Sequence, residues 1–298
     1  MKQGIRTDLS TKIVQGIGYV FISMFVFVCL LPFFLMVSSS FSSEKAIVEH
    51  GFSIFPRDFT TASYRILFTK PDQIVGSYIV TILLTSTGTA IGLFLVAMTG
   101  YALQRPDFPY RNGIAFYIYF TTLFSGGLVP FYILISKHLH LRDNYLAVLL
   151  PSLMSPWLII LMKSFAKSIP HAITESAKID GAGDFTIFLQ LVLPLSKPAL
   201  ATIGLFIALT YWNDWYNAML FLSPNVKYRP LQLFLYNAVT AAEFIRNSAA
   251  GANIPPQDIP AETMKMATAV IATGPVVIFY PFVQKYFIRG ITIGAVKG

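Results

Sequence analysis

Residues 168–198 read SIPHAITESAKIDGAGDFTIFLQLVLPLSKP and form a long polar interruption between two apolar runs. Pro170 has a ring-fixed φ that suits a first helical turn, and Gly181 can adopt the left-handed conformation that ends a helix. The stretch therefore predicts a helix of about three turns between these two residues. Asp184 is predicted to cap a second short helix through Phe185 to Leu193.

The first predicted helix has two unlike faces. Spacings of three and four residues place on one face Ala172, Ile173, Ser176, Ala177 and Asp180. The opposite face carries His171, Glu175 and Lys178. A helix this short is marginal alone in water, and small side chains allow another backbone to come close. We therefore expect the helix to dock onto a partner.

The composition is that of an integral membrane protein. Of the 298 residues 55% are hydrophobic and 12% are charged, whereas charged residues make up about a quarter of soluble domains. The net charge of +8 is explained by Lys and Arg in loops on the inner side of a membrane. Cys29 is the only cysteine and the four histidines are dispersed, so the sequence predicts neither a disulfide framework nor a metal site.

The hydrophobic runs predict an all-α membrane protein with a single domain, 1–298, and six transmembrane helices. The spans lie at about 17–37, 77–101, 113–135, 145–165, 199–222 and 264–287, with the docking loop 168–198 between the fourth and fifth. A signal peptide at the N-terminus would have a shorter apolar region than the first run. Six spans place both termini and the docking loop on the same, inner side.

Glycines and prolines add detail to this topology. Gly88 and Gly92 form a small-xxx-small pair that permits close helix packing. Gly126, Gly127 and Pro130 are expected to bend the third span near its outer half. The external segments are 41–73, with a short helix near 62–68, and 223–263.

The docking loop resembles the signature loop of bacterial ABC-importer permeases, whose pattern is Glu-Ala-Ala, a Gly and then Ile-x-Leu-Pro. The matching residues are Glu175-Ser176-Ala177, Gly181 and Leu191-x-Leu193-Pro194, with Ser176 and Leu191 as conservative departures. The resemblance implies a coupling helix that sits in a cleft of a cytoplasmic ATPase subunit. The positions that it marks for ATPase coupling are Glu175, Ser176, Ala177, Asp180, Gly181, Ala182 and Pro194. The alternative is an ordinary interfacial helix between two spans.

Further stretches resemble the carbohydrate-importer, maltose-permease type over nearly the whole chain, among them TGYALQRPDFPYRN and KYFIRGITIGAVKG. Residues 41–68 resemble the subgroup that imports complex oligosaccharides. The resemblance implies a heterodimer with a second permease, two ATPase subunits and an extracytoplasmic sugar-binding protein, in the inner cell membrane. It also implies that a C-terminal tail with Gly294, Lys297 and Gly298 reaches the ATPases.

The sequence contains no phosphate-binding Gly-x-x-x-x-Gly-Lys-Ser/Thr motif and no catalytic signature. We therefore expect no enzyme activity and no cofactor on this chain; ATP and Mg would be bound by the partner ATPases. A secondary transporter or channel half that works without ATP is a second hypothesis, although such proteins usually carry intramembrane ionisable groups. A membrane scaffold without transport activity is a third.

An intramembrane polar cluster marks the predicted fifth span. Trp212, Asn213, Asp214 and Asn217 would line a sugar path, because aromatic rings accept the apolar face of a pyranose and amides satisfy hydroxyls. The alternative is an aromatic belt at the outer interface with Asp214 as a structural hydrogen-bond acceptor. Arg-containing external segments are compatible with an oligosaccharide of uronic acids.

Overall fold

A computed structural model of the protein describes residues 9–250 and 260–295. The chain forms two compact units. Unit 1 contains residues 1–69 and 237–274, and unit 2 contains residues 70–236 and 275–298.

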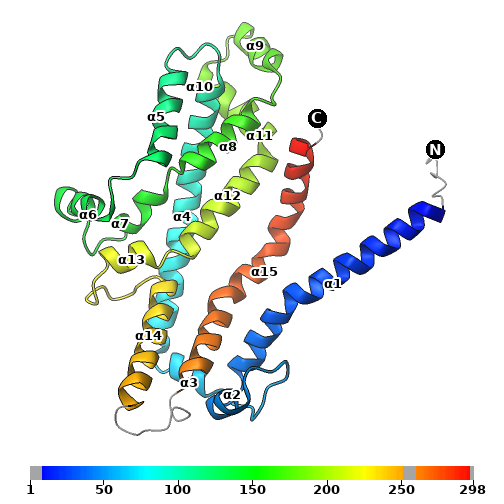
Figure 1. The fold of residues 1–298 in the computed structure, drawn as a ribbon. Helices are drawn as coiled ribbons and strands as arrows, with labels where there is room; N and C mark the ends of the chain where they lie inside the picture. The colour runs from blue at the N-terminus through cyan, green and yellow to red at the C-terminus, as the bar shows by residue number, and fades with distance from the viewer. Residues whose placement is uncertain (1–8, 251–259, 296–298) are drawn as a thin grey trace. The chain divides into compact units, whose positions relative to one another are not determined.

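All regular structure in the described residues is helical (Figure 1). The elements are α1 (Leu9–Ser40), α2 (Glu44–His50), α3 (Ala62–Leu67), α4 (Pro71–Gln104), α5 (Arg111–Leu123), α6 (Leu128–Ile133), η1 (Leu134–His138), α7 (Leu146–Leu149), η2 (Leu150–Ser152), α8 (Pro156–Ala166), α9 (His171–Ile179), α10 (Asp184–Ile187), η3 (Phe188–Val192), α11 (Leu193–Leu195), α12 (Lys197–Trp212), α13 (Tyr216–Phe221), α14 (Leu231–Ala250) and α15 (Ala261–Ala295).

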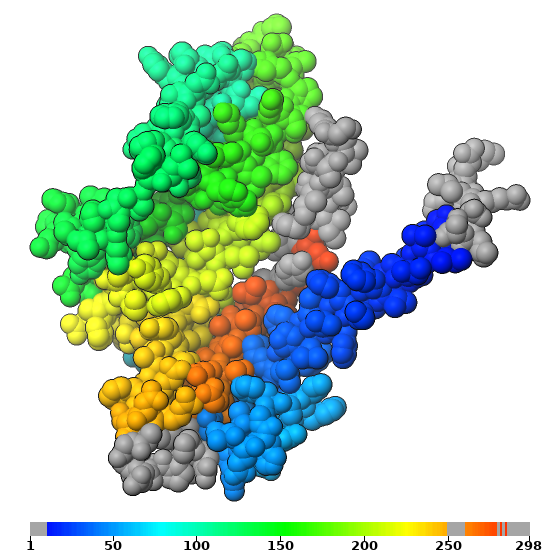
Figure 2. All heavy atoms as spheres, in the orientation of Figure 1, coloured from blue at the N-terminus to red at the C-terminus, as the bar shows by residue number. Residues whose placement is uncertain are grey.

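Two of the described helices are long and apolar enough to cross a membrane, residues Thr11–Ser40 of α1 and Pro71–Gln104 of α4. Three bent helix pairs raise this number to five if each pair is one span. Figure 2 shows α1 in blue as a rod that extends away from the segment 41–69 of its own unit. Most of the apolar side chains of α1 are exposed, which is the surface that lipid or another membrane helix requires.

The bent pairs lie where the sequence contains glycine, proline or polar residues. The α5 axis turns by 113° into α6–η1 after residues 124–127, so the expected bend at Gly126 and Gly127 is confirmed. The pair α7–η2 and α8 is bent by 44°, and the segment from α10 to α11 meets α12 at 86°. The predicted continuous helix over 199–222 is wrong, because α12 ends at Trp212 and a break precedes α13. The segment 223–263, predicted to be external, contains the 20-residue helix α14.

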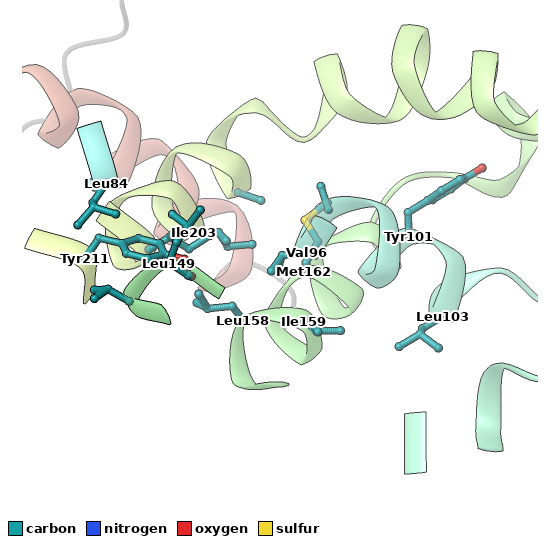
Figure 3. Packing of buried hydrophobic residues seen from close by; sticks show 14 of the residues in the cluster. Leu84, Val96, Tyr101, Leu103, Leu149, Leu158, Ile159, Met162, Ile203 and Tyr211 are labelled. Carbon is teal, nitrogen blue, oxygen red and sulfur yellow. Dashed lines mark hydrogen bonds between the residues drawn. The ribbon is translucent and has the colours of Figure 1, made fainter. Parts of the chain in front are cut away.

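The core of unit 2 lies among α4, α8 and α12 (Figure 3). Val96 on α4, Met162 on α8 and Ile203 on α12 are completely inaccessible to solvent. Gly88 packs directly on the ring of Tyr211, whose hydroxyl donates to the Leu149 carbonyl at 2.7 Å. The expected close packing at Gly88 and Gly92 is thus confirmed, because α4 and α12 approach at both glycines.

Unit 1 is held together by a buried carboxylate. Glu44, only 6% exposed, accepts hydrogen bonds from the backbone N–H groups of Glu262 and Thr263 and from the Thr263 hydroxyl, at 2.8–2.9 Å. The Ser63 hydroxyl also donates to Thr263 Oγ1 at 2.8 Å. Since the first N–H groups of a helix have no partner inside the helix, Glu44 caps α15 from a segment that is distant in sequence.

Replacement of Glu44 by Ala is expected to destabilise the chain by about 3 kcal/mol, because two buried N–H groups at the start of α15 lose a charged acceptor. The measurement is the thermal unfolding midpoint of the detergent-solubilised protein. Glu49→Ala is the matched control, since Glu49 is partly exposed and its one ion pair, to Lys45, is 4.0 Å long. Equal midpoints for the two variants would contradict the capping role.

Candidate functional site

The predicted docking helix is present as α9, from His171 to Ile179, directly after Pro170. Two backbone hydrogen bonds close the end of this helix, one from the Gly181 N–H to the Lys178 carbonyl and one from the Ala182 N–H to the Ala177 carbonyl. Gly181 has a φ of +82°, so this is the Schellman end that glycine permits. A Cβ at Gly181 would meet no surrounding side chain or backbone within 4 Å. Glycine is therefore favoured there by the backbone conformation and not by a lack of space.

The surface of α9 is largely free of contacts with the rest of unit 2. None of its residues is buried, and Ile179 is 86% exposed. Ser176 and Asp180 are exposed as well, whereas Ala177 is half-buried and packs on the unit 2 core, as does Ala182. Ala177 therefore seats α9 on its own chain. Ile179 thus presents an exposed apolar side chain at the end of α9.

Glu175 lies on the opposite side of α9 from Ala177. Its carboxylate is 3.2 Å from Nδ1 of His171, one turn earlier, and both side chains are about half exposed or more. This exposed pair adds little to stability. The Glu175 carboxylate is thus accessible to a partner.

The predicted capping role of Asp184 is wrong. Gly183 occupies the N-cap position, Asp184 is the first residue of α10, and no side chain caps that helix. The Asp184 carboxylate instead lies 2.6 Å from Nη1 of Arg105, at the end of α4. A guanidinium that is only 14% exposed attracts this carboxylate more strongly than the start of a four-residue helix does.

Arg105 and Asp184 belong to a network of four charges, with Asp107 and Lys178, that joins α4 to α9 and α10. Arg105 pairs with Asp107 in a two-pronged contact, and Lys178 Nζ lies 2.6 Å from Asp107 Oδ2 and 3.8 Å from Asp184 Oδ1. Hydrogen bonds from Arg105 and Lys178 hold the pKa of Asp107 well below its usual range, and the hydrogen bond with Asp107 raises the pKa of Arg105. Arg105 and Asp107 therefore stay charged at neutral pH.

A hollow of about 400 Å³ lies beside this network. Three network residues line it, Arg105, Asp107 and Lys178, together with Tyr101, Gln104 and Glu175. The Arg105 guanidinium lies 5.8 Å from the Tyr101 ring centroid. Figure 3 shows Tyr101 pointing to the opposite side of the α4 end from Leu103. The charge network thus holds α9 at one end of α4, beside this hollow.

For the transport activity that the signature loop implies, reversal of one network charge, Lys178→Asp, is expected to lower uptake by about tenfold, because it places three carboxylates around Arg105. Adding Asp107→Lys restores the alternation of charge and should recover most of the activity. ATP-dependent uptake by proteoliposomes measures both, with Lys197→Asp at an exposed position of α12 as the control. A double variant as inactive as the single one would contradict the pairing.

Pro194 lies in α11, directly after the π-helical turn η3. The Leu193 N–H donates to the Phe188 carbonyl, five residues earlier. Because proline has no N–H, the wider turn adjusts the backbone just before the position where a donor is missing. Pro194 thus belongs to the bent connection from α9 to α12.

The predicted sugar-path residues gather at the break between α12 and α13. Asn213 donates from Nδ2 to the Leu209 carbonyl at 2.9 Å and accepts from Gln232 Nε2 at 3.3 Å. Asp214 accepts from the backbone N–H of Asn217 at 3.0 Å and from its Nδ2 at 2.9 Å. Trp212, at the end of α12, is half-buried. Asp214 therefore organises the turn between the two helices, the structural role that the sequence left open.

Of the predicted tail residues, Gly294 lies in α15, and Lys297 and Gly298 lie outside the described residues. The charge network was missed by sequence reasoning. Arg105 and Asp107 stand in a short loop with two prolines, but nothing in the spacing pairs Asp107 with Lys178, 71 residues later.

Comparison with known proteins identifies the family. The family described as "Binding-protein-dependent transport system inner membrane component" matches residues 100–293, which include the charge network, α9 and the α12–α13 break. A polygalacturonan/rhamnogalacturonan transport system permease protein, YtcP of Bacillus subtilis (strain 168), is 40% identical over 97% of this chain and 100% of its own length. Protein LplC of the same organism is 37% identical over 91% of this chain and 90% of its own length.

A solved structure agrees with these relatives. One chain of a bacterial ABC transporter, described as "involved in the import of the acidic polysaccharide alginate", has a TM-score of 0.75 and 31% identity. The match covers 94% of this chain and 98% of that one. The sequence and the fold thus lead to the same conclusion. The chain belongs to the family of inner membrane components of binding-protein-dependent transport systems.

Proposed function

We propose that this chain is the permease subunit of an ATP-binding-cassette importer for an acidic, uronate-containing oligosaccharide. The observation that carries the proposal is the open face of α9, with Ser176, Ile179 and Asp180 exposed and the helix fixed to α4 by ion pairs. If a neighbouring subunit displaces α9, the ion pairs would carry this displacement to the membrane helix α4. Family membership supports the transport function.

In the proposed topology, six spans place α9 on the cytoplasmic side between the fourth and fifth spans, with both termini on that side. The residues that contact the ATPase would be Glu175, Ser176, Asp180 and Gly181 on the open side of the loop. Ala177, Ala182 and Pro194 would hold the loop in place. The tail from Gly294 to Gly298 is proposed as a second ATPase contact.

The proposed assembly contains a second, homologous permease, two ATPase subunits that bind ATP and Mg, and an extracytoplasmic solute-binding protein. ATP-driven closure of the ATPases would move α9 as a rigid body and rock the two permeases between inward and outward openings. This chain would form half of the path and bind no nucleotide.

The substrate class is proposed from the relatives. Polygalacturonan, rhamnogalacturonan and alginate, named for two of them, are acidic polysaccharides, and this chain matches both proteins over nearly its full length. The test is uptake of a labelled oligogalacturonide and of a neutral oligosaccharide of the same length by the reconstituted transporter with its binding protein. ATP-dependent uptake of the acidic sugar supports the proposal. ATP-independent uptake would assign the chain to secondary transport or a channel, and lack of flux would assign it to a scaffold.

Trp212 and Asn213 are proposed to contact the sugar, next to the turn that Asp214 and Asn217 fix. The double variant Trp212→Ala, Asn213→Ala is expected to reduce uptake by about tenfold or more through lost stacking and hydrogen bonds. Trp157→Ala on α8 serves as a control for the loss of an exposed tryptophan. Unchanged uptake with the double variant would place the sugar path elsewhere.

A further inference from the structure

A second hollow, of about 670 Å³, lies where α4 ends, α5 begins and α8 ends. The helices α5 and α8 contact each other at this end of unit 2 (Figure 1). Arg111, Lys163, Lys167 and His171 line the hollow, and Gln104, Asn112 and Ser164 add neutral hydrogen-bonding groups. None of the described residues that line it is an Asp or a Glu.

Arg111, Lys163 and Lys167 form no ion pair with an Asp or Glu in the described part of unit 2, whereas Nδ1 of His171 lies 3.2 Å from the Glu175 carboxylate. The nearby carboxylates of Asp107 and Asp184 are already paired with Arg105 and Lys178. Arg111 donates through Nη1 to the Arg105 carbonyl at 3.1 Å, which positions its guanidinium and leaves the other N–H groups for a ligand.

Lys163 and Lys167 are four residues apart at the end of α8 and line the same hollow. Like charges at this spacing repel each other, and a bound anion removes the repulsion. The partial negative charge at the C-terminal end of a helix favours a cation, but one lysine would be enough for this interaction. The pair therefore points to an anionic ligand between the two ammonium groups.

An apolar groove continues from the hollow along α5 and α8. It has a volume of about 290 Å³ and is lined by Ala115, Phe116, Ile118, Tyr119 and Ile159. Leu103, Ile160 and Lys163 line both the groove and the hollow, so the two spaces are contiguous. A cationic cavity joined to an apolar groove matches a molecule with an anionic head and a hydrocarbon chain.

We propose that the hollow and the groove bind one anionic phospholipid, with its phosphate between Arg111, Lys163 and Lys167 and an acyl chain along α5 and α8. Basic pockets between membrane helices on the inner side bind such headgroups, and long cationic side chains reach from the apolar region to the phosphate. His171, which begins α9, lines the same hollow. The lipid would thus lie against the start of the docking helix, independently of the sugar that is transported.

An acidic segment of a partner protein is the competing ligand. It would account for the cations, but the contiguous groove is lined mostly by apolar side chains, which match a hydrocarbon chain better than a carboxylate-rich peptide. The groove decides in favour of lipid.

The test uses the assembled transporter in mild detergent and native mass spectrometry with titrated phosphatidylglycerol or phosphatidylcholine. We expect one phosphatidylglycerol to bind tightly per copy of this chain, and phosphatidylcholine to bind far more weakly. The variant Lys163→Gln, Lys167→Gln should weaken the phosphatidylglycerol complex on the order of 30-fold, since each lysine near a phosphate contributes about a factor of five. The matched control, Lys137→Gln, Lys227→Gln, removes the same charge from two exposed positions that do not line the hollow and should leave binding unchanged.

Competition on the unmodified transporter keeps the proposal testable if the double variant does not assemble. Glycerol phosphate, which has the head but no chain, should fail to displace phosphatidylglycerol at equal concentration. Displacement by glycerol phosphate, or equal binding of the two lipids, would overturn the proposal. Loss of an ATPase or permease subunit from the double variant, with lipid binding unchanged, would also overturn it and assign the cations to a protein contact.

Discussion

Replacement of Gly181 by Ala is expected to lower ATP-dependent transport more than tenfold while the transporter still assembles. The backbone at Gly181 has a φ of +82°, where a Cβ costs about 1–2 kcal/mol. Relief of this strain opens the hydrogen bonds from Gly181 and Ala182 that end α9 and turns the helix away from its partner.

Gly183→Ala is the matched control for this variant. Gly183 lies two residues later in the same loop, has an ordinary φ of −69°, and has open space around a built Cβ. Its replacement should change transport less than twofold. Uptake by proteoliposomes, together with the amount of ATPase that co-purifies, separates the two effects. Similar losses for both variants would mean that the loop is sensitive to any side chain and that the left-handed turn has no special role.

Replacement of Gly88 by Ala is expected to destabilise unit 2 by about 2 kcal/mol or more, because the added methyl group would lie within the ring of Tyr211. The ring cannot move freely, since Tyr211 is only 3% exposed and its hydroxyl donates to the Leu149 carbonyl. The thermal unfolding midpoint of the detergent-solubilised chain should fall by several degrees.

The control for Gly88 is Gly204→Ala on the facing helix. A Cβ at Gly204 would meet Leu93 Cδ2 at 3.5 Å, an ordinary contact, so this variant should unfold near the midpoint of the unmodified protein. The double variant Gly88→Ala, Tyr211→Leu should be less destabilised than the sum of its single changes, because the clash is removed with the ring. Strict additivity would show that the two residues do not press on each other.

Local backbone features could be predicted from the sequence. Pro170 and Gly181 bracket α9 because each fixes a backbone conformation by its own covalent structure. The bend near Gly126 and the close approach at Gly88 follow from the same kind of reasoning.

Features that depend on distant partners could not be predicted. Asp184 follows Gly183 in a pattern typical of a helix cap, but Arg105, 79 residues earlier, provides a stronger partner. Glu44 gives no sign in sequence that it will cap a helix beginning at Ala261. The break after Trp212 was missed because the run 199–222 is mostly apolar, and its polar cluster, Asn213, Asp214 and Asn217, was interpreted as part of a sugar path and not as the end of a helix.

The lipid site illustrates the same limit. Lys163 and Lys167 are visible in the sequence as a basic end of a span, and Arg111 as a basic start of another. Only the packing of α5 on α8 brings them into one cavity that continues into an apolar groove.

The central claim, that α9 docks onto an ATPase subunit, is tested most directly by disulfide cross-linking. Cys29 is replaced by Ala, which leaves the chain without cysteine, and Ser176→Cys is introduced on the open face of α9. Single cysteines are placed along the surface cleft of the partner ATPase, and the assembled transporter is oxidised in inside-out membrane vesicles. The account predicts a cross-link between the two chains from Ser176→Cys and none from Lys137→Cys, a matched exposed position in η1. A Ser176→Cys that forms no cross-link with any ATPase position, or that reacts only with impermeant reagents from the outer face of intact cells, would contradict the account.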